Sequence, residues 1–179
     1  MLSLIIILIL LYAIYIGTRR GFIMQAVYTI GYFIVFWIAQ AMSHSLGPKL
    51  SLIVPYPSAI EDSYFAFFQK SIGLSLDDAF YIGVAFVLVM FIGSLLVRFS
   101  GLLLNSLTYM PGLKRFNKTI GGFLNFLVVY IGIFLLLYVM ALVPLDGLQK
   151  TLRDSTVARV IVLHTPVLTS QVTSWWIAG

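Results

Sequence analysis

The chain has 179 residues, of which 61% are hydrophobic and only 9% are charged, and its formal net charge is +5. Because a soluble domain carries roughly a quarter charged residues, this composition excludes an ordinary water-soluble fold. The eleven basic residues are scattered between apolar runs, with no stripe interleaved with aromatic residues, which argues against nucleic-acid binding. The sequence contains no cysteine, which excludes disulfides and thiolate metal ligands.

The apolar runs predict an all-α, polytopic membrane protein with about four transmembrane helices and short interfacial amphipathic helices. A helix needs about 20 apolar residues to cross the roughly 30 Å hydrocarbon layer of a bilayer. The predicted spans cover residues 2–17, 21–42, 76–100 and 119–143. The first is the shortest, because its uncharged run from Leu2 to Ile16 extends only about 22 Å. A re-entrant hairpin formed with the second span is the alternative for that segment.

The loop between the second and third spans has the pattern of a helix that lies on the membrane surface. Ser58 and Glu61 have the spacing of a capping box, which marks a helix start. Apolar residues then recur at helical spacing at Ile60, Tyr64, Phe67, Phe68 and Ile72. We therefore expect an interfacial amphipathic helix over residues 59–72.

In the tail, residues 145–179, an apolar face is interrupted by Asp154 and Ser155 and ends at Pro166, which favours two short interfacial helices over one before that proline. Trp175 and Trp176 suit the headgroup region, where a ring can be half apolar and half wet. The sequence thus predicts a four-helix membrane domain over residues 1–164 and an amphipathic, membrane-associated tail over residues 145–179.

The distribution of lysine and arginine predicts the orientation. The turn at residues 17–20 and the loop at residues 98–118 contain six basic and no acidic residues, namely Arg19, Arg20, Arg98, Lys114, Arg115 and Lys118. The rest of the chain contains five basic and six acidic residues. Because short loops rich in lysine and arginine stay in the cytoplasm, we expect both termini outside. Each basic residue near anionic headgroups contributes about 1 kcal/mol to membrane attachment.

The polar residues inside the predicted spans are all neutral. They are Gln25, Thr29, Gln40, Ser94 and Asn125. One interpretation is a polar path for a solute, but we favour hydrogen bonds between helices, worth about 0.6–2 kcal/mol each, because carriers and proton relays usually hold an ionisable group in the membrane. The glycines of the last two spans suit close helix packing, namely Gly83, Gly93, Gly121, Gly122 and Gly132. Gly17 and Gly21 flank two arginines, so we interpret them as a tight chain reversal and not as a dimerisation motif.

Ionisable residues form no recognisable catalytic or metal-binding pattern. The acidic pairs Glu61/Asp62 and Asp77/Asp78 each lie at a predicted helix start, where the helix dipole favours negative charge. His44 and His164 have no partner at ligand spacing. We therefore expect no catalytic residues, no metal and no cofactor. An intramembrane enzyme would depend on Asp77, Asp78 or His164.

Two segments resemble the signature of the colicin V production (CvpA) family. Gly17-Thr18-Arg19-Arg20-Gly21-Phe22-Ile23-Met24-Gln25 is similar to its glycine, basic turn and Gly-Phe, and Phe116-Asn117-Lys118-Thr119-Ile120-Gly121-Gly122 is similar to its entry into the last helix. The signature positions are thus Gly17, Arg19, Arg20, Gly21, Phe22, Gln25, Asn117, Lys118 and Gly121. The hydropathy agrees from Met1 to about His164. Ser3, Gln25 and Asn125 depart from the family pattern, as does the long outer loop, which argues against a membrane-embedded carboxylate.

The resemblance implies a bacterial cytoplasmic (inner) membrane protein associated with production or export of a peptide toxin and with envelope homeostasis. We expect it to be non-enzymatic and to act through other membrane proteins or with itself. A small channel or carrier assembled as an oligomer is the alternative function.

Overall fold

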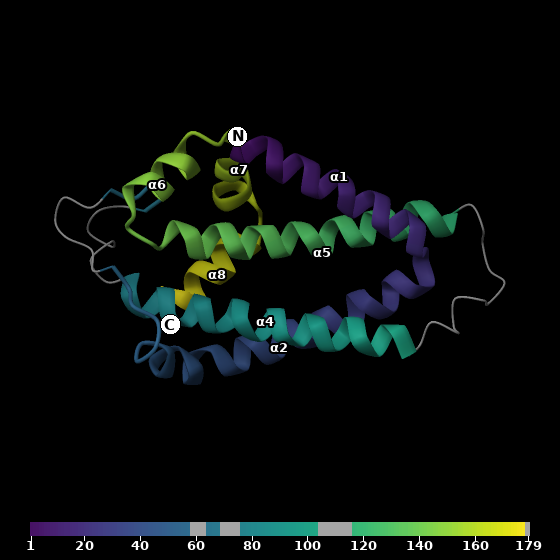
Figure 1. Ribbon diagram of the computed structural model, residues 1–179, viewed down its shortest axis with the longest axis horizontal. Helices are drawn as coiled ribbons and strands as arrows, with labels where there is room; N and C mark the ends of the chain where they lie inside the picture. The colour runs from purple at the N-terminus through teal and green to yellow at the C-terminus, as the bar shows by residue number, and fades with distance from the viewer. Residues whose placement is uncertain (58–63, 69–75, 104–115, 178–179) are drawn as a thin grey trace.

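A computed structural model describes residues 1–57, 64–68, 76–103 and 116–177. Within these ranges the chain forms helices joined by short connections, with no strand (Figure 1). The helices are α1 (Leu2–Arg20), α2 (Phe22–Leu50), α4 (Leu76–Leu103), α5 (Phe116–Ala141), α6 (Asp146–Arg153), α7 (Thr156–His164) and α8 (Leu168–Trp176). The predicted all-α fold is confirmed.

Four of these helices, α1, α2, α4 and α5, are long and apolar enough to cross a membrane. The helix α1 is continuous over 19 residues, which corresponds to about 28 Å. It packs along α5 and touches α2 only near their junction, so it does not form a re-entrant hairpin with α2 (Figure 1). The predicted set of four spans is confirmed.

The helix α2 differs most from its predicted bounds, because it continues eight residues beyond residue 42, to Leu50. The apolar run that gave the prediction ends at Met42, and the stretch after it contains polar residues and Pro48. Helical structure persists because the added turns pack on α4, where Gly47 lies against Ile82. The last span, α5, begins at Phe116 and ends at Ala141, slightly ahead of the predicted 119–143.

The four long helices form two layers of two antiparallel helices (Figure 1). One layer pairs α1 with α5, and the other pairs α2 with α4, while α2 also contacts α5 across the layers. The junction of α1 and α2, the end of α4 and the start of α5 gather at one end of the bundle (Figure 1). Arg19 and Arg20 therefore lie at the same end as Arg98 and Lys118.

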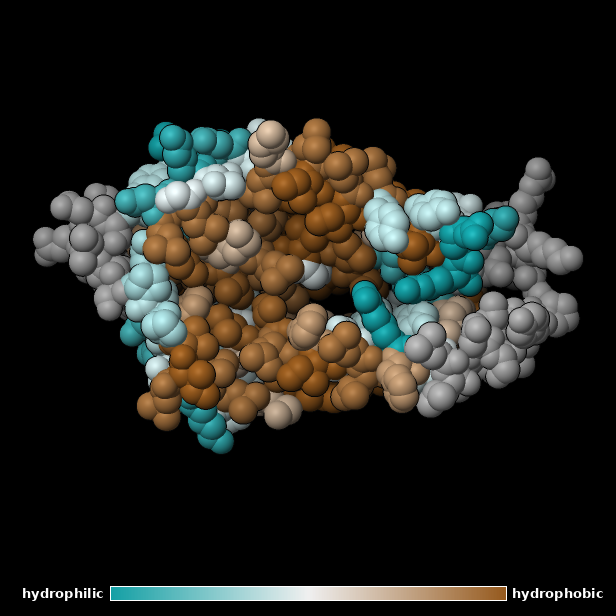
Figure 2. Space-filling view, in the orientation of Figure 1, coloured by the Kyte–Doolittle hydropathy of each residue, from teal (hydrophilic) through white to brown (hydrophobic). Residues whose placement is uncertain are grey.

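The bundle surface has a wide apolar belt between two hydrophilic ends (Figure 2). On α1 alone, Leu4, Leu8 and Leu11 each expose more than half of their surface. Such a belt is unstable in water and stable in lipid, which accounts for helices that are apolar almost all round.

Glycines set the spacing of the α2–α4 pair. An added Cβ would lie 3.1 Å or closer to the opposite helix at each of four contacts, namely Gly31 with Val97, Val35 with Gly93, Tyr28 with Gly101, and Gly47 with Ile82. Each glycine thus accepts a larger side chain, as small residues do in membrane helix pairs. The predicted packing role is wrong for Gly132, because nothing lies within 4 Å of the Cβ that it would carry.

The tail forms three short helices, of which α6 and α7 are the two predicted before Pro166 and α8 follows that proline. The first, α6, lies beside α5 and α7; α7 contacts α1 and α5; and α8 contacts α4.

Trp176 is only 2% exposed and packs on Phe86 and Tyr138, so its predicted place at the headgroups is wrong. Phe86 lies about 14 Å along α4 from Asp77, because helices rise 1.5 Å per residue. The indole of Trp176 therefore packs in the apolar core of the bundle.

The interfacial helix expected over residues 59–72 falls mostly outside the described residues, as do Ser58, Glu61 and Asp62. The part that is described, residues 64–68, forms bends and no helical turn. Its backbone is bound by a side chain from another part of the chain, because the amide of Ala66 donates to Oε1 of Gln149 at 2.8 Å. A tertiary contact therefore replaces the helical hydrogen bonds in this short stretch.

Candidate functional site

The first signature segment ends α1 and packs directly on the start of α5. A Cβ on Gly17 would lie 2.8 Å from the Cα of Gly122 and closer still to the carbonyl oxygen of Gly121. A Cβ on Gly121 would lie 2.7 Å from the carbonyl oxygen of Gly17. The backbones of the two signature segments therefore touch, which only glycine at these positions permits.

Gly21 separates α1 from α2 with φ 80° and ψ 167°. Residues other than glycine rarely adopt this backbone conformation, so the sharp turn requires glycine. Gly17, by contrast, lies inside α1, and its interpretation as part of the chain reversal is wrong. Sequence reasoning missed its packing role because a single segment does not reveal its partner helix.

The remaining signature residues surround this crossing. Arg19 and Lys118 are exposed, and Phe22 is partly exposed at 41%. The side chain of Asn117 lies outside the described residues, as do Lys114 and Arg115. The crossing itself is thus made of backbone, and the cationic side chains of Arg19 and Lys118 lie exposed beside it.

The five polar residues of the spans behave differently from one another. Asn125 on α5 donates from Nδ2 to the carbonyl oxygen of Ala13 on α1 at 2.6 Å, and so links the two helices near the glycine crossing. The hydroxyls of Thr29 and Ser94 instead donate to carbonyls of their own helices, at 2.8 Å each. Serine and threonine can satisfy themselves in this way without a second helix.

The hydrogen bonds between helices expected of the two glutamines are absent in the described part of the chain. Gln25 is fully buried, and neither of its amide atoms has a partner. The Oε1 atom of Gln40 is also buried and unpaired. A buried amide without a partner destabilises the fold by about 1–3 kcal/mol, so these residues are not explained by packing alone.

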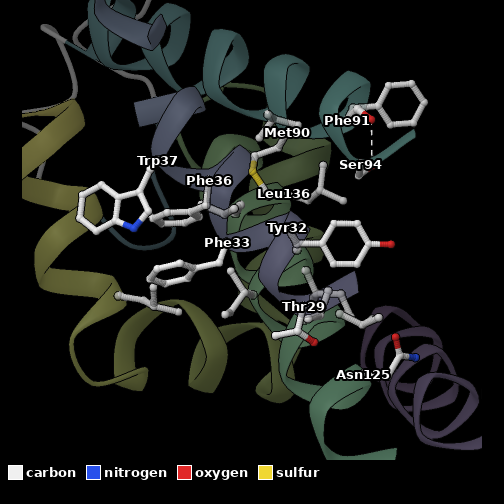
Figure 3. A pocket seen from close by; sticks show the side chains of 18 of the residues that line it. Thr29, Tyr32, Phe33, Phe36, Trp37, Met90, Phe91, Ser94, Asn125 and Leu136 are labelled. Carbon is white, nitrogen blue, oxygen red and sulfur yellow. Dashed lines mark hydrogen bonds between the residues drawn. The ribbon is translucent and has the colours of Figure 1, made fainter. Parts of the chain in front are cut away.

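A cleft of about 600 Å³ separates the two layers on one side. Polar and charged residues line part of it. They include Thr29 and Asn125, Ser94 and Arg98 at one end, and Gln171 on α8. Between them the walls are apolar, and Phe36, Met90 and Leu136 converge from α2, α4 and α5 (Figure 3). The cleft brings together residues that the sequence analysis treated one by one.

Two arginines bracket a stacked pair of tyrosines beside this cleft. The rings of Tyr28 and Tyr32 are 6.2 Å apart at 16°. The guanidinium of Arg20 lies 4.8 Å from the ring centroid of Tyr28, and Nε of Arg98 donates to the hydroxyl of Tyr32 at 3.3 Å. Guanidinium groups bind aromatic faces favourably, so the stack holds two cations at the basic end of the bundle.

At the other end, Gln149 is a residue that sequence reasoning missed. It is fully buried, donates to the carbonyls of Ala141 and Val143, and accepts from the amide of Ala66. It thereby satisfies carbonyls at the end of α5, which a helix leaves without partners. The sequence around Gln149 contains no signal for this role, because its partners Ala66 and Ala141 belong to other parts of the chain.

Tyr56 anchors the loop that follows α2 by donating to the carbonyl of Leu142 at 2.9 Å. Burial, followed by the negative charge of Asp77 and by Tyr81, raises the pKa of Tyr56 to about 12. The phenol therefore stays neutral and remains a hydrogen-bond donor well above its ordinary range.

The described ionisable residues that might support chemistry lie at the surface. Asp77 and Asp78 occupy the first turn of α4, and both are exposed. His44 and His164 are exposed as well. Within the described ranges, no three histidine, aspartate or glutamate side chains come together.

The signature segments now have a common location, and comparison with known proteins gives their family. The family described as colicin V production protein matches residues 2–166. The chain belongs to the colicin V production protein family. A relative, the uncharacterized transmembrane protein YshB of Bacillus subtilis (strain 168), is 31% identical over 176 residues, which cover 98% of this chain and 97% of the relative. No solved structure matches the fold.

The family match spans both signature segments and all four long helices, so the family predicted from the sequence is confirmed. It also includes α6 and α7, and the relative extends over nearly the whole chain. The colicin V production protein family thus covers the bundle together with most of its tail.

Proposed function

We propose that this protein is a non-enzymatic component of the bacterial cytoplasmic membrane that assists production or export of a peptide toxin and envelope homeostasis. In this proposal it acts by binding other membrane proteins, and both of its termini lie outside. The description of the family supports the toxin-related role.

The observation that carries the non-enzymatic role is the chemistry of the buried polar groups. The buried polar side chains that the structure describes are all neutral, namely Gln25, Ser43, Asn125, Gln149, Ser155 and Thr165. Asn125 and Gln149 connect helices or loops, and Ser155 caps α7 by accepting from the amide of Ala158. The three paired groups, Asn125, Gln149 and Ser155, support a scaffold. Proton transfer in a membrane interior usually needs an ionisable group.

Partner binding is supported by the apolar outer face of α1, which the other helices leave uncovered. Leu8 on this face exposes 56% of its surface, whereas Phe134 on α5 is fully buried. A photo-crosslinking amino acid at Leu8, with one at Phe134 as control, tests the proposal in native membranes. We expect a reproducible crosslink to a different protein from Leu8 and none from Phe134. Crosslinks only to lipid or only to a second copy of this chain would contradict the proposal.

The orientation has its own test. Moving Arg19 and Arg20 to the amino-terminal side of α1 removes the positive charge that retains this turn in the cytoplasm. We expect reporters fused to the termini to show inverted or mixed insertion. Unchanged reporter topology after the exchange would contradict the proposed orientation.

The cleft between the layers favours a second candidate, a small oligomeric channel or carrier. It contains the neutral polar groups of Thr29, Ser94 and Asn125. Flux through reconstituted vesicles that disappears with Asn125→Leu supports this function, and flux that is unchanged in the variant eliminates it.

A further inference from the structure

The cleft between the layers has an open interior and a side exposed to the bilayer. Figure 2 shows the surface hollowed between the two layers, near the hydrophilic end. Nothing lies within 4 Å of a Cβ built on Gly132, which lines the cleft from α5. With a volume of about 600 Å³, the cleft lies within the range of sites for small molecules, roughly 300–1,000 Å³.

One end of the cleft is cationic and the rest is apolar. Arg98 lies in the last turns of α4, close to where the helix leaves the apolar belt. It is exposed, and within the described residues it has no acidic partner; its Nε contacts only the hydroxyl of Tyr32. The same tyrosine stack holds Arg20. A site with positive charge at its mouth and apolar walls behind is complementary to an anionic amphiphile.

The length of the cleft corresponds to one leaflet. Val87 and Arg98 both line it and are eleven residues apart on α4. This separation amounts to about 16 Å at 1.5 Å per residue, close to half of the roughly 30 Å hydrocarbon layer. If the phosphate of a phospholipid lies beside Arg98, its acyl chain would therefore reach the inner end of the cleft.

A transmembrane helix fits this space poorly. A helix is about 10 Å wide with its side chains, and the side chains of Phe36, Met90 and Leu136 converge in the space that it would need (Figure 3). An acyl chain is a single file of methylenes and needs a much narrower path between Phe36, Met90 and Leu136, which line the cleft.

We propose that the cleft binds one anionic phospholipid, with its phosphate on Arg98 and one acyl chain between the layers. The guanidinium can donate two parallel hydrogen bonds to the phosphate oxygens. The chain then covers the apolar walls that α2, α4 and α5 leave exposed. This site is independent of the proposed role in toxin production.

Native mass spectrometry of the purified full chain tests this site with two probes, phosphatidylglycerol and phosphatidylcholine. We expect one retained lipid per chain, with phosphatidylglycerol preferred. Arg98→Gln should reduce that preference about ten-fold or more, because a charge-assisted hydrogen bond is lost. The control Arg159→Gln removes the same charge from an exposed position on α7 and should leave the preference unchanged. Equal preference in the wild type and Arg98→Gln would overturn the proposal.

Filling the cleft provides a second variant. Gly132→Phe projects a ring into the open space and should abolish retention of both lipids; lipid retained by a folded Gly132→Phe chain would contradict the site. A third measurement needs no substitution: phosphatidylglycerol with a photoreactive acyl chain should label Phe36, Met90 or Leu136. Labelling confined to the outer face of α1, or a lipid-free dimer as the main species, would also overturn the proposal.

Discussion

The glycine crossing between α1 and α5 yields the sharpest prediction, because the chain provides its own control. Gly121→Ala adds a Cβ 2.7 Å from the carbonyl oxygen of Gly17 and 2.8 Å from the carbonyl carbon of Gly21. Gly132→Ala makes the same change on the same helix, where nothing lies within 4 Å. The two variants differ only in what the new methyl group meets.

The expected magnitude follows from these contacts. The closest contact in Gly121→Ala is about 0.7 Å short of ordinary van der Waals distance, which begins at 3.4 Å. The opposing atoms are backbone, and Gly21 lies at a turn with φ 80°, so neither side can move cheaply. Forced overpacking of this kind destabilises a fold by about 1–3 kcal/mol. Replacing a helical glycine with alanine contributes about 0.5–1 kcal/mol of stability in both variants, and this contribution cancels in the comparison.

Equilibrium unfolding in mixed micelles, titrated with a denaturing detergent, measures the difference. We expect Gly132→Ala to match or exceed the wild type in stability, and Gly121→Ala to be about 1–3 kcal/mol less stable than Gly132→Ala. If Gly121→Ala is as stable as Gly132→Ala, the two signature segments are not in backbone contact, and the reasoning is refuted.

Three other contacts give separate predictions. The hydroxyls of Ser3 and Ser155 lie 2.8 Å apart, so in this naturally cysteine-free chain the pair Ser3→Cys/Ser155→Cys should form a disulfide within one molecule, seen by gel mobility; failure to form one would contradict the docking of the tail on α1. Gln149→Leu should destabilise the fold by about 1–3 kcal/mol for each carbonyl left unpaired, whereas Gln171→Leu at an exposed position should have little effect on the same unfolding titration. Because the pKa of Tyr56 is raised in the folded state, its stabilising contribution is complete below about pH 10 and is lost as the pH rises toward 12; Tyr56→Phe should remove this part of the alkaline transition, and an unchanged transition would count against it.

The sequence by itself determined the solvent, the number of spans and the family. Lipid as solvent follows from composition, since uncharged runs of about 20 residues are stable only in a bilayer or a buried core. The family follows from two local segments, the first containing Gly17 and Gly21 and the second Gly121. Each of these properties can be recognised from continuous stretches of sequence, so no knowledge of the fold is needed.

The tertiary structure alone decided which helices are neighbours. It pairs α1 with α5 and not with α2, and this pairing converts Gly17 and Gly121 from separate motifs into one crossing. It also buries Trp176 among core rings and assigns Gln149 to the end of α5, although the local pattern placed the tryptophan at headgroups and gave the glutamine no role. The physical reason is that amphipathicity shows whether a residue suits a buried or an exposed position, whereas the identity of its partner depends on helices distant in sequence.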